Sequence, residues 1–348
     1  MCSRKMKLAL VCLAGLILLN GCPKPPQEEE VLGDVYILNE GGWGANNASL
    51  SCYNSTTKAL SKDCFLTQNK RGLGDLANDL KRYGGKLYCV VNGSNTVEVM
   101  DVLTGKSIKQ ISLPGKSPRR IAFWQNKAYV CCWDGTVVRI DTAALTVETA
   151  VNVGRNPEDL CVSNGKLYVT NSGGLDFPNY DSTVSVVDLK TFTETKRIVV
   201  GANPSRIQAD NYGNVFLIVM GNYGDVPTTF KCISSQTDEV THSFDIAANN
   251  FTISGNSAYL YHYDYVATFW VKEFNVVSKQ ITKENFFIES VGIQSPYGIA
   301  VDASNGDVYL TDARTFTESG DVYCFDKNGK KKFKLEVGVA PNNVVIVR

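Results

Sequence analysis

Histidine is scarce in this chain of 348 residues, and its scarcity argues against several kinds of chemistry. Only two histidines occur, His242 in a strand-like run and His262 within the sequence YHYDY. They form no His-rich metal pattern, and no Ser/His/Asp arrangement occurs at a usable spacing. A glycine-rich phosphate loop after a predicted strand is also missing. We therefore predict a protein that is not an enzyme, with no catalytic residues, no metal site and no resident cofactor.

The sequence has no excess of charge of either sign. It contains 35 Lys and Arg residues and 35 Asp and Glu residues. Removal of the leader described below would take away three basic residues and leave the chain slightly acidic. Nucleic-acid-binding surfaces are usually marked by a clustered basic excess, so we expect no nucleic-acid partner.

Long hydrophobic runs are also missing, apart from one near the start. Residues 8–19 are apolar and follow three basic residues. This run is shorter than the about 20 residues that a membrane-spanning helix needs, and a basic start before a short apolar run is typical of a secretory signal. The run ends in Leu-Asn-Gly-Cys, which resembles the lipobox of bacterial lipoproteins. We predict a signal peptide over 1–21 and a lipidated cysteine at Cys22.

The segment that follows Cys22 is predicted to be a tether. Its prolines and the acidic run Glu28, Glu29 and Glu30 resist packing, so residues 22–32 should form a stiff, solvated linker. Acyl chains on Cys22 would hold the protein at a membrane surface. In lipoproteins of Bacteroides and relatives, an acidic stretch soon after the lipidated cysteine is associated with export to the outer face of the outer membrane. This resemblance implies a lipid-anchored outer-membrane protein that faces the cell surface.

The chain has eleven cysteines, of which the predicted leader and anchor take three. The spacings of the remaining eight match no zinc pattern. Cys52, Cys232 and Cys324 occupy the same position in a repeated phrase, which favours small buried packing residues. A disulfide between Cys52 and Cys64 across a hairpin is the alternative for one of them.

The body of the chain repeats itself seven times. One phrase contains a polar turn, a small or apolar residue, an aromatic residue and then apolar or β-branched residues, and a run such as TVSVVD follows it. A third phrase, Pro-x-x-apolar or a proline-free version of it, precedes the aromatic one. The aromatic positions are separated by 39 to 52 residues and are Tyr36, Tyr88, Tyr129, Tyr168, Phe216, Tyr259 and Tyr309. Seven such units with four short strands each predict an all-β, seven-bladed β-propeller over 33–348.

The two ends of the repeat region predict how the ring closes. The last phrase, APNNVVIVR, ends at Arg348 with no aromatic strand after it. The first aromatic phrase, DVYIL, begins at Asp34 with no Pro-x-x strand before it. We therefore expect the C-terminal strand to pair with the N-terminal strand and complete the first blade, which removes two free sheet edges.

Candidate binding residues follow from the order of the strands. When strands A to D run outward in each blade, the D–A and B–C loops share one face of the ring. The B–C loops are long and rich in aromatic residues, and such loops on a rigid scaffold are where binding usually occurs. The D–A connections add polar residues around the mouth of the channel. The candidate ligand-binding residues are Trp43, Asn92, Arg120, Trp133, Arg155, Asp159, Tyr180, Arg206, Tyr223, Tyr263, Tyr297, Arg314 and Asn343.

The opening VYILNEGGWGANNASLSCY, the recurrent GxNPxxL/I and the run TVSVVD resemble the YncE-like propellers of Bacteroides lipoproteins. Within that group the chain is similar to surface-exposed cobalamin-capture lipoproteins of the BtuG type. The resemblance implies that the protein binds vitamin B12 or another corrinoid. It also implies that the protein delivers this ligand to a TonB-dependent outer-membrane transporter on which it sits.

Two alternatives remain open. The protein could be a surface interaction module that binds a glycan, a peptide or a partner protein without a small ligand. It could also be an enzyme of the lactonase or quinoprotein propeller type, which would need clustered catalytic carboxylates, histidines or a metal on the loop face. The scarcity of histidine argues against the enzyme. Aromatic residues in the loops of several blades favour a ligand in the mouth.

Overall fold

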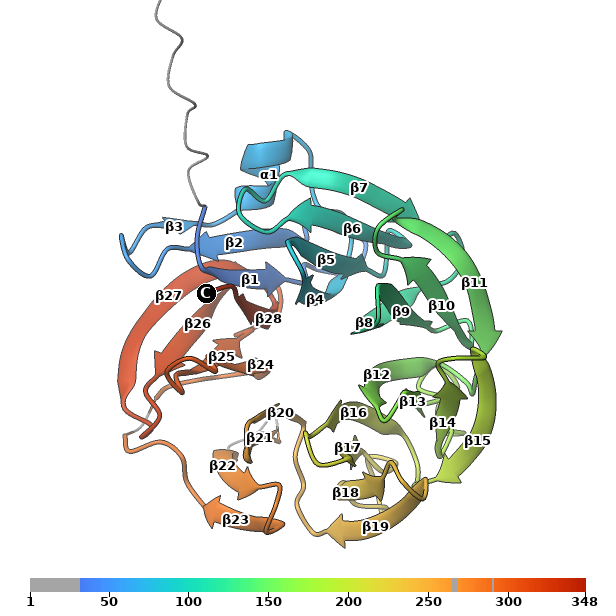
Figure 1. Cartoon of the computed structure of the whole chain (residues 1–348). Coiled ribbons are helices and arrows are strands. Elements are labelled where there is room, and N and C mark those ends of the chain that lie inside the picture. The colour runs from blue at the N-terminus through green and yellow to red at the C-terminus, as the bar shows by residue number, and fades with distance from the viewer. Residues whose placement is uncertain (1–31, 265–267, 290) are drawn as a thin grey trace, which may run out of the picture. The chain divides into compact units, whose positions relative to one another are not determined.

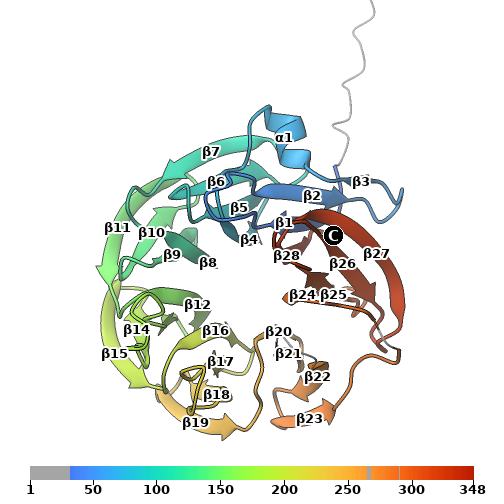
Figure 2. The same ribbon diagram turned by 180° about the vertical axis from the view of Figure 1, so that it is seen from behind.

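The computed structural model describes residues 32–264, 268–289 and 291–348. Within them, 28 strands form seven four-stranded antiparallel sheets that surround a central axis (Figure 1 and, from behind, Figure 2). The predicted all-β, seven-bladed propeller is confirmed. The predicted signal peptide, Cys22 and all of the predicted tether except Leu32 lie outside the described residues.

In each blade, strand A is the innermost strand and strand D is the outermost. Blade 1 contains, from A to D, β28 (Pro341–Ile346), β1 (Val35–Asn39), β2 (Ser49–Tyr53) and β3 (Leu60–Ser61). Blade 2 contains β4 (Ala77–Tyr83), β5 (Lys86–Val91), β6 (Thr96–Asp101) and β7 (Ser107–Ser112). Blade 3 contains β8 (Pro118–Trp124), β9 (Lys127–Cys132), β10 (Thr136–Asp141) and β11 (Thr146–Asn152). Blade 4 contains β12 (Pro157–Ser163), β13 (Lys166–Asn171), β14 (Thr183–Asp188) and β15 (Thr193–Val199).

The remaining three blades follow the same plan. Blade 5 contains β16 (Pro204–Ala209), β17 (Asn214–Val219), β18 (Thr229–Ser234) and β19 (Glu239–Phe244). Blade 6 contains β20 (Asn250–Ser254), β21 (Ser257–Tyr263), β22 (Phe269–Asn275) and β23 (Gln280–Lys283). Blade 7 contains β24 (Pro296–Val301), β25 (Val308–Asp312), β26 (Ser319–Phe325) and β27 (Lys331–Val339).

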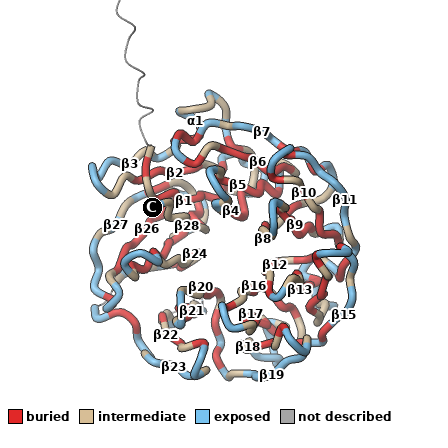
Figure 3. Tube along the Cα trace, in the orientation of Figure 1, coloured by how far each residue is buried: buried red, intermediate tan, exposed pale blue. Residues whose placement is uncertain are grey.

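Burial changes from the middle of each blade to its rim, as Figure 3 shows. In blade 4 the B strand KLYVTN is buried at every position after its first residue, whereas most of the D strand TETKRIV is exposed. The apolar B and C strands pack against the neighbouring blade on both faces, so their sequences are nearly continuous apolar runs. The D strands face solvent and carry charged residues, which protects the outer edges of the sheets from pairing with other chains.

The repeated tyrosine of the B strands joins consecutive blades. Tyr36 is fully buried and its hydroxyl donates to the carbonyl of Val102 in blade 2 at 2.7 Å. Tyr168 in blade 4 likewise donates to the carboxylate of Asp238 in blade 5 at 2.5 Å. A large aromatic ring fills the space between two sheets, and its hydroxyl gains a partner in the C–D turn of the next blade. This inter-blade contact explains why the phrase recurs.

The ring closes as the sequence predicts. β28 pairs antiparallel with β1, with Ile346 opposite Val35 and Val344 opposite Ile37. The C-terminal strand is therefore the innermost strand of the blade that the N-terminal strands build. All seven sheets and all seven core clusters are built from residues 32–348, so this compact unit contains every strand that it needs.

Blade 1 has a short outer edge that a helix and a disulfide reinforce. β3 has only two residues, and the helix α1 (Cys64–Asn69) follows it, capped by the Asp63 carboxylate, which accepts from the Leu66 amide at 3.0 Å. Cys52 and Cys64 form a disulfide with a Cα–Cα distance of 6.0 Å. The packing role predicted from the repeat is correct for Cys232 and Cys324, which are free and buried. It is wrong for Cys52, where the alternative disulfide is the one that forms.

Candidate functional site

Two cavities meet where the D–A and B–C loops surround the ring opening, a surface that we call the mouth face. The first cavity, the mouth pocket, has a volume of about 360 Å³ and is lined by residues of blades 3 to 7. Its lining consists of Arg119, Glu158, Ser172, Gly174, Tyr180, Asn203, Ser205, Arg206, Met220, Tyr223, Asn249, Tyr261, Tyr263, Pro296, Tyr297 and Phe316. The pocket therefore combines aromatic walls with amide, hydroxyl and charged groups, as ligand sites commonly do.

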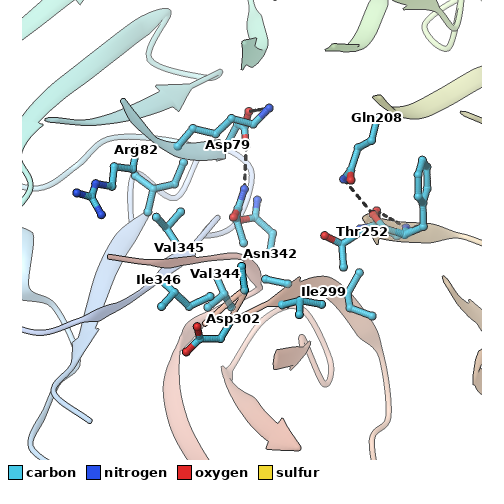
Figure 4. Close-up of a pocket in the computed structure, with 18 of the residues that line it drawn as sticks. Asp79, Arg82, Gln208, Thr252, Ile299, Asp302, Asn342, Val344, Val345 and Ile346 are labelled. Atoms are coloured by element: carbon cyan, nitrogen blue, oxygen red, sulfur yellow. Dashed lines mark hydrogen bonds and ion pairs between the residues drawn. The ribbon is translucent and has the colours of Figure 1, made fainter. Parts of the chain in front are cut away.

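The second cavity, the channel, has a volume of about 490 Å³ and is lined by residues from all seven innermost strands. Figure 4 shows part of this lining, with side chains from several of these strands. Three carboxylates and five basic side chains line the channel: Asp79, Asp159 and Asp302, and Lys81, Arg82, Arg120, Arg206 and Arg348. Arg206 lines both cavities and so lies where they meet.

A charged triad from three consecutive blades lies along the channel wall near the mouth. The Arg120 guanidinium lies 3.5 Å from a carboxylate oxygen of Asp79 and 3.9 Å from one of Asp159. The Asn343 amide also donates to Asp79 at 2.8 Å. Burial disfavours the charged form of Arg120, but the carboxylates of Asp159 and Asp79 outweigh it and raise the pKa of the guanidinium. The triad therefore holds its charges in place around the channel wall.

One half of the mouth is closed by hydrogen bonds to Glu40, at the end of β1. The buried Glu40 carboxylate accepts from Asn78 at 2.6 Å, from Tyr297 at 2.5 Å and from Asn342 at 3.1 Å. These three residues stand at equivalent positions, one residue after the start of each innermost strand. Burial, together with the neighbouring Glu40 carboxylate, raises the pKa of the Tyr297 hydroxyl. Glu40 thus ties blades 1, 2 and 7 together at the mouth.

Arg119 continues this network toward blade 4. Its guanidinium donates to Asn78 at 2.6 Å and to Glu158 at 2.5 Å. It also lies over the Trp133 ring, 4.2 Å from the centroid, and the indole NH donates to Glu158 at 3.0 Å. The side chains of Arg119 and Glu158 are only 16% and 17% exposed. A charge pair with this many partners holds one wall of the mouth pocket rigid.

The other half of the mouth is open and aromatic. Tyr180 and Tyr223 come from the B–C loops of blades 4 and 5, and their ring centroids are 6.1 Å apart. Phe177 continues this row, 6.0 Å from Tyr180. Tyr223 and Phe177 are 70% and 71% exposed, so they extend the pocket wall onto the surface. Across the pocket, the Tyr297 and Phe316 rings contact edge to face at 5.2 Å.

The thirteen predicted ligand-binding residues divide into four groups. The mouth pocket brings together Tyr180, Arg206, Tyr223, Tyr263 and Tyr297. The channel contains Arg120, Asp159 and Asn343, and again Arg206. A third cavity, of about 480 Å³ between blades 3 and 4, contains Trp133 and Arg155. The residues that line none of these three cavities are Trp43, Asn92 and Arg314.

The three residues outside these cavities have other surroundings. Trp43 is 79% exposed in the B–C loop of blade 1. Asn92 is buried, and its amide donates to the carbonyl of Pro118 at 3.0 Å, which joins blades 2 and 3. Arg314 forms two hydrogen bonds of 2.8 Å with Asp321 on β26, so its guanidinium is already engaged by its own blade.

Several residues of the mouth were not among the candidates. Glu40 gave no signal in the sequence except that it directly follows a predicted strand in NEGGW, and its partners are distant in the chain. Arg119, Glu158, Ser205 and Asn249 each stand one residue before a polar residue that lines the channel, namely Arg120, Asp159, Arg206 and Asn250, so they form a second ring that the repeat spacing indicates. The loop aromatics Tyr261 and Phe316 complete the lining.

Asp159 makes a testable contribution to the pH dependence of stability. Burial raises the pKa of Asp159 to about 6, against the opposing attraction of Arg120 and Lys81. Because its pKa in the unfolded chain is about 3.9, the native state binds the extra proton between these values, and the contribution of Asp159 to stability falls as pH rises from about 4 to about 6. We expect the free energy of unfolding of the wild type, minus that of Asp159→Asn, to decrease by about 2 kcal/mol between pH 4 and pH 7. Denaturant titrations at the two pH values test this, and a pH-independent difference would contradict it.

No group of three or more His, Cys, Asp or Glu side chains that could hold a metal ion occurs among residues 32–264, 268–289 and 291–348. In the same part of the chain, no helix combines the length and the apolar character needed to cross a membrane.

Seven four-stranded blades around a channel, with cavities where the loops of one face meet, define a seven-bladed β-propeller. Residues 33–339 match the family described as domain of unknown function (DUF5074). The chain therefore belongs to the DUF5074 family. No curated protein sequence matches it.

Solved structures share the fold at low sequence identity. A quinonprotein alcohol dehydrogenase-like protein from Bacteroides thetaiotaomicron matches with a TM-score of 0.66 and 17% identity, over 92% of this chain and 80% of that one. The hydrazine synthase of Kuenenia stuttgartiensis matches with a TM-score of 0.63 and 14% identity, over 75% of this chain and 86% of that one. The computationally designed protein Ika8 matches with a TM-score of 0.57 and 15% identity, over 88% and 89% of the two chains. At these identities the similarity extends to the fold alone.

Proposed function

We propose that this protein captures a bulky ligand in the mouth pocket without transforming it, and that the ligand is a corrinoid such as vitamin B12. The observation that carries the proposal is the pocket itself, in which the aromatic walls of Tyr180, Tyr223 and Tyr263 surround amide and guanidinium groups. A flat macrocycle edged with amides would stack on the aromatic rings and exchange hydrogen bonds with the polar groups. The rigid wall formed by Arg119 and Glu158 supports tight binding because little order has to be gained when the ligand binds.

The size of the pocket limits how much of a corrinoid could enter it. A volume of about 360 Å³ is small for a site that encloses a whole ligand, since small-molecule pockets range from about 300 to 1,000 Å³. One edge of the macrocycle would enter the pocket. The remainder would rest on the exposed row formed by Phe177 and Tyr223 beside it.

The proposal includes a place of action. A signal peptide, lipidation at Cys22 and the acidic tether would put the propeller on the outer face of the outer membrane. From there it would deliver the corrinoid to a TonB-dependent transporter. Support for this part comes from the N-terminal sequence pattern, which lies outside the described residues.

A matched pair of tyrosines in blade 5 tests the site. Tyr223 is 70% exposed in the B–C loop at the mouth, and Tyr212 is 56% exposed in the A–B loop at the opposite face. We expect Tyr223→Ala to weaken cyanocobalamin binding by at least about tenfold, since a stacked aromatic residue contributes about 1.5 kcal/mol. Tyr212→Ala should bind as the wild type does. Isothermal titration calorimetry measures both, and equal affinities for the two variants would place the ligand elsewhere.

An exposed apolar row favours a second function, that of an interaction module. Leu175, Phe177, Tyr223 and Val226 in the B–C loops of blades 4 and 5 are between 43% and 71% exposed. Such a row could bind a glycan, a peptide or a partner protein. In this case Leu175→Ser and Phe177→Ser would reduce capture of the partner while Arg206→Gln, inside the pocket, would not. Corrinoid capture predicts instead that residues inside the pocket matter most.

A further inference from the structure

We propose that Arg206, which lines both the mouth pocket and the channel, anchors a subsite for a phosphate-type oxyanion. The oxyanion is either free in solution or carried by a larger ligand in the pocket. This inference does not depend on the ligand being a corrinoid, because it concerns only the charged group that the subsite accepts.

The first observation is that Arg206 lacks a counter-charge. It is half-buried and lines both cavities, yet it has no hydrogen-bond or ion-pair partner in the described part of the chain. The corresponding arginines of blade 3 are engaged, Arg119 by Glu158 and Arg120 by two aspartates. A guanidinium withdrawn from water without a partner is costly, and its fork of donors can bind two oxygens of a phosphate-type oxyanion at once.

The second observation is a set of unused donors around Arg206. The side-chain donors of Asn203, Ser205 and Asn249 line the mouth pocket and make no hydrogen bond to another described residue. The one carboxylate of the pocket, Glu158, already accepts from Arg119 and from Trp133. The pocket therefore offers free donors and a free positive charge, which is the complement of an oxyanion rather than of a cation.

The charges that line the channel also favour an oxyanion at Arg206. Its basic side chains outnumber its carboxylates by five to three. Among the channel carboxylates, Asp159 has its oxygens occupied by the amides of Leu160 at 2.8 Å and Ile207 at 3.3 Å and by the ion pair with Arg120. The Nε atom of Arg120, which also lines the channel, has no hydrogen-bond partner within the described residues. An oxyanion would reach Arg206 from the mouth side, away from the Asp159 carboxylate.

The test compares three probes on the propeller, residues 32–348: inorganic phosphate, phenyl phosphate and phenol. Phenyl phosphate should bind, and calorimetry with Arg206→Gln should give a dissociation constant higher by at least about tenfold, the effect of one charge-assisted hydrogen bond. The matched control is Arg139→Gln, because Arg139 is paired with Glu148 on the outer part of blade 3 and should leave the affinity unchanged. Phenol should bind much more weakly than phenyl phosphate.

The probes also separate the two sources of the oxyanion. If inorganic phosphate binds as tightly as phenyl phosphate, the subsite takes the free ion. If only phenyl phosphate binds, the oxyanion is carried by a ligand whose ring lies against the tyrosines. If neither anion binds at about 50 mM, or if Arg206→Gln binds them as the wild type does, the inference is overturned.

Folding of the variant is checked in the same experiment. Because Arg206 has no partner among the described residues, the melting temperature of Arg206→Gln without ligand should be no lower than that of the wild type. Phenyl phosphate should raise the melting temperature of the wild type and not that of the variant. Cyanocobalamin binding that persists in Arg206→Gln would leave corrinoid capture standing while removing Arg206 as its anchor.

Discussion

Deletion of Pro341–Arg348 is expected to leave a chain that does not form a stable monomeric propeller. The deleted segment is β28 and the two residues after it, and it supplies the innermost strand of blade 1. Without it, β1 loses every backbone partner on one side, from Val35 to Asn39. An unpaired central strand is also an edge on which other chains can pair, so the truncated protein should aggregate.

The expected loss in the free energy of unfolding is large compared with the stability of a typical domain. Val344 is 6% exposed, and three further apolar residues of the segment are partly buried against the core. Burial of such side chains contributes about 1.5–3 kcal/mol each. The hydrogen bonds from Asn342 to Glu40 and from Asn343 to Asp79 would be lost as well. Together, the lost burial and the lost hydrogen bonds exceed about 5 kcal/mol, the lower end of typical domain stabilities.

Deletion of Arg348 alone is the control for this experiment. It removes ion pairs with Asp34 and with the buried Asp302 but keeps all of β28, so it should leave a folded monomer and cost less than the longer deletion. Circular dichroism with thermal denaturation, together with gel filtration, distinguishes the two deletions. A cooperative transition at the wild-type temperature in the longer deletion would show that closure by β28 is not needed.

Replacement of Arg119 by Gln is expected to lower the free energy of unfolding by about 3–5 kcal/mol, because it removes one partner of a largely buried charge pair. Glu158 would keep a negative charge that is 17% exposed, with the Trp133 indole as its remaining partner. The side-chain oxygen of Asn78 would lose the hydrogen bond that it now accepts from Arg119. The stacking of the guanidinium on Trp133 would also be lost.

A second arginine on the mouth face, Arg155, provides a control for the stability cost of Arg119→Gln. Arg155 pairs with Asp176 at 2.5 Å, but the two side chains are 50% and 57% exposed. Arg155→Gln should therefore cost at most about 1 kcal/mol. Urea denaturation of the two variants at one pH measures the difference. Similar losses for both variants would mean that the mouth network is not a rigid support.

The fold was predictable because each blade repeats the same short sequence patterns. The Pro-x-x phrase marks the innermost strand, which begins at Pro118, Pro157, Pro204, Pro296 and Pro341. The aromatic phrase marks the buried B strand that follows it. Ring closure followed from the incomplete phrases at the two ends. None of these predictions needed knowledge of contacts between distant residues.

The site was only partly predictable, since it depends on such contacts. The equivalence of the blades placed the candidate residues in rings around the mouth, but it could not show which would be paired. Glu40 engages residues of blades 1, 2 and 7, and this closes one half of the ring that the repeat suggests is uniform. The helix α1 and the disulfide of Cys52 also depart from the repeat, because blade 1 has a D strand of only two residues.

The most direct test of corrinoid capture is a titration of the propeller, residues 32–348, with cyanocobalamin, followed by calorimetry and by the visible absorbance of the ligand. We expect binding at one site per chain with a dissociation constant in the nanomolar range or below, about −12 kcal/mol or stronger. No heat and no spectral change at tens of micromolar, roughly −6 kcal/mol or weaker, would contradict corrinoid capture.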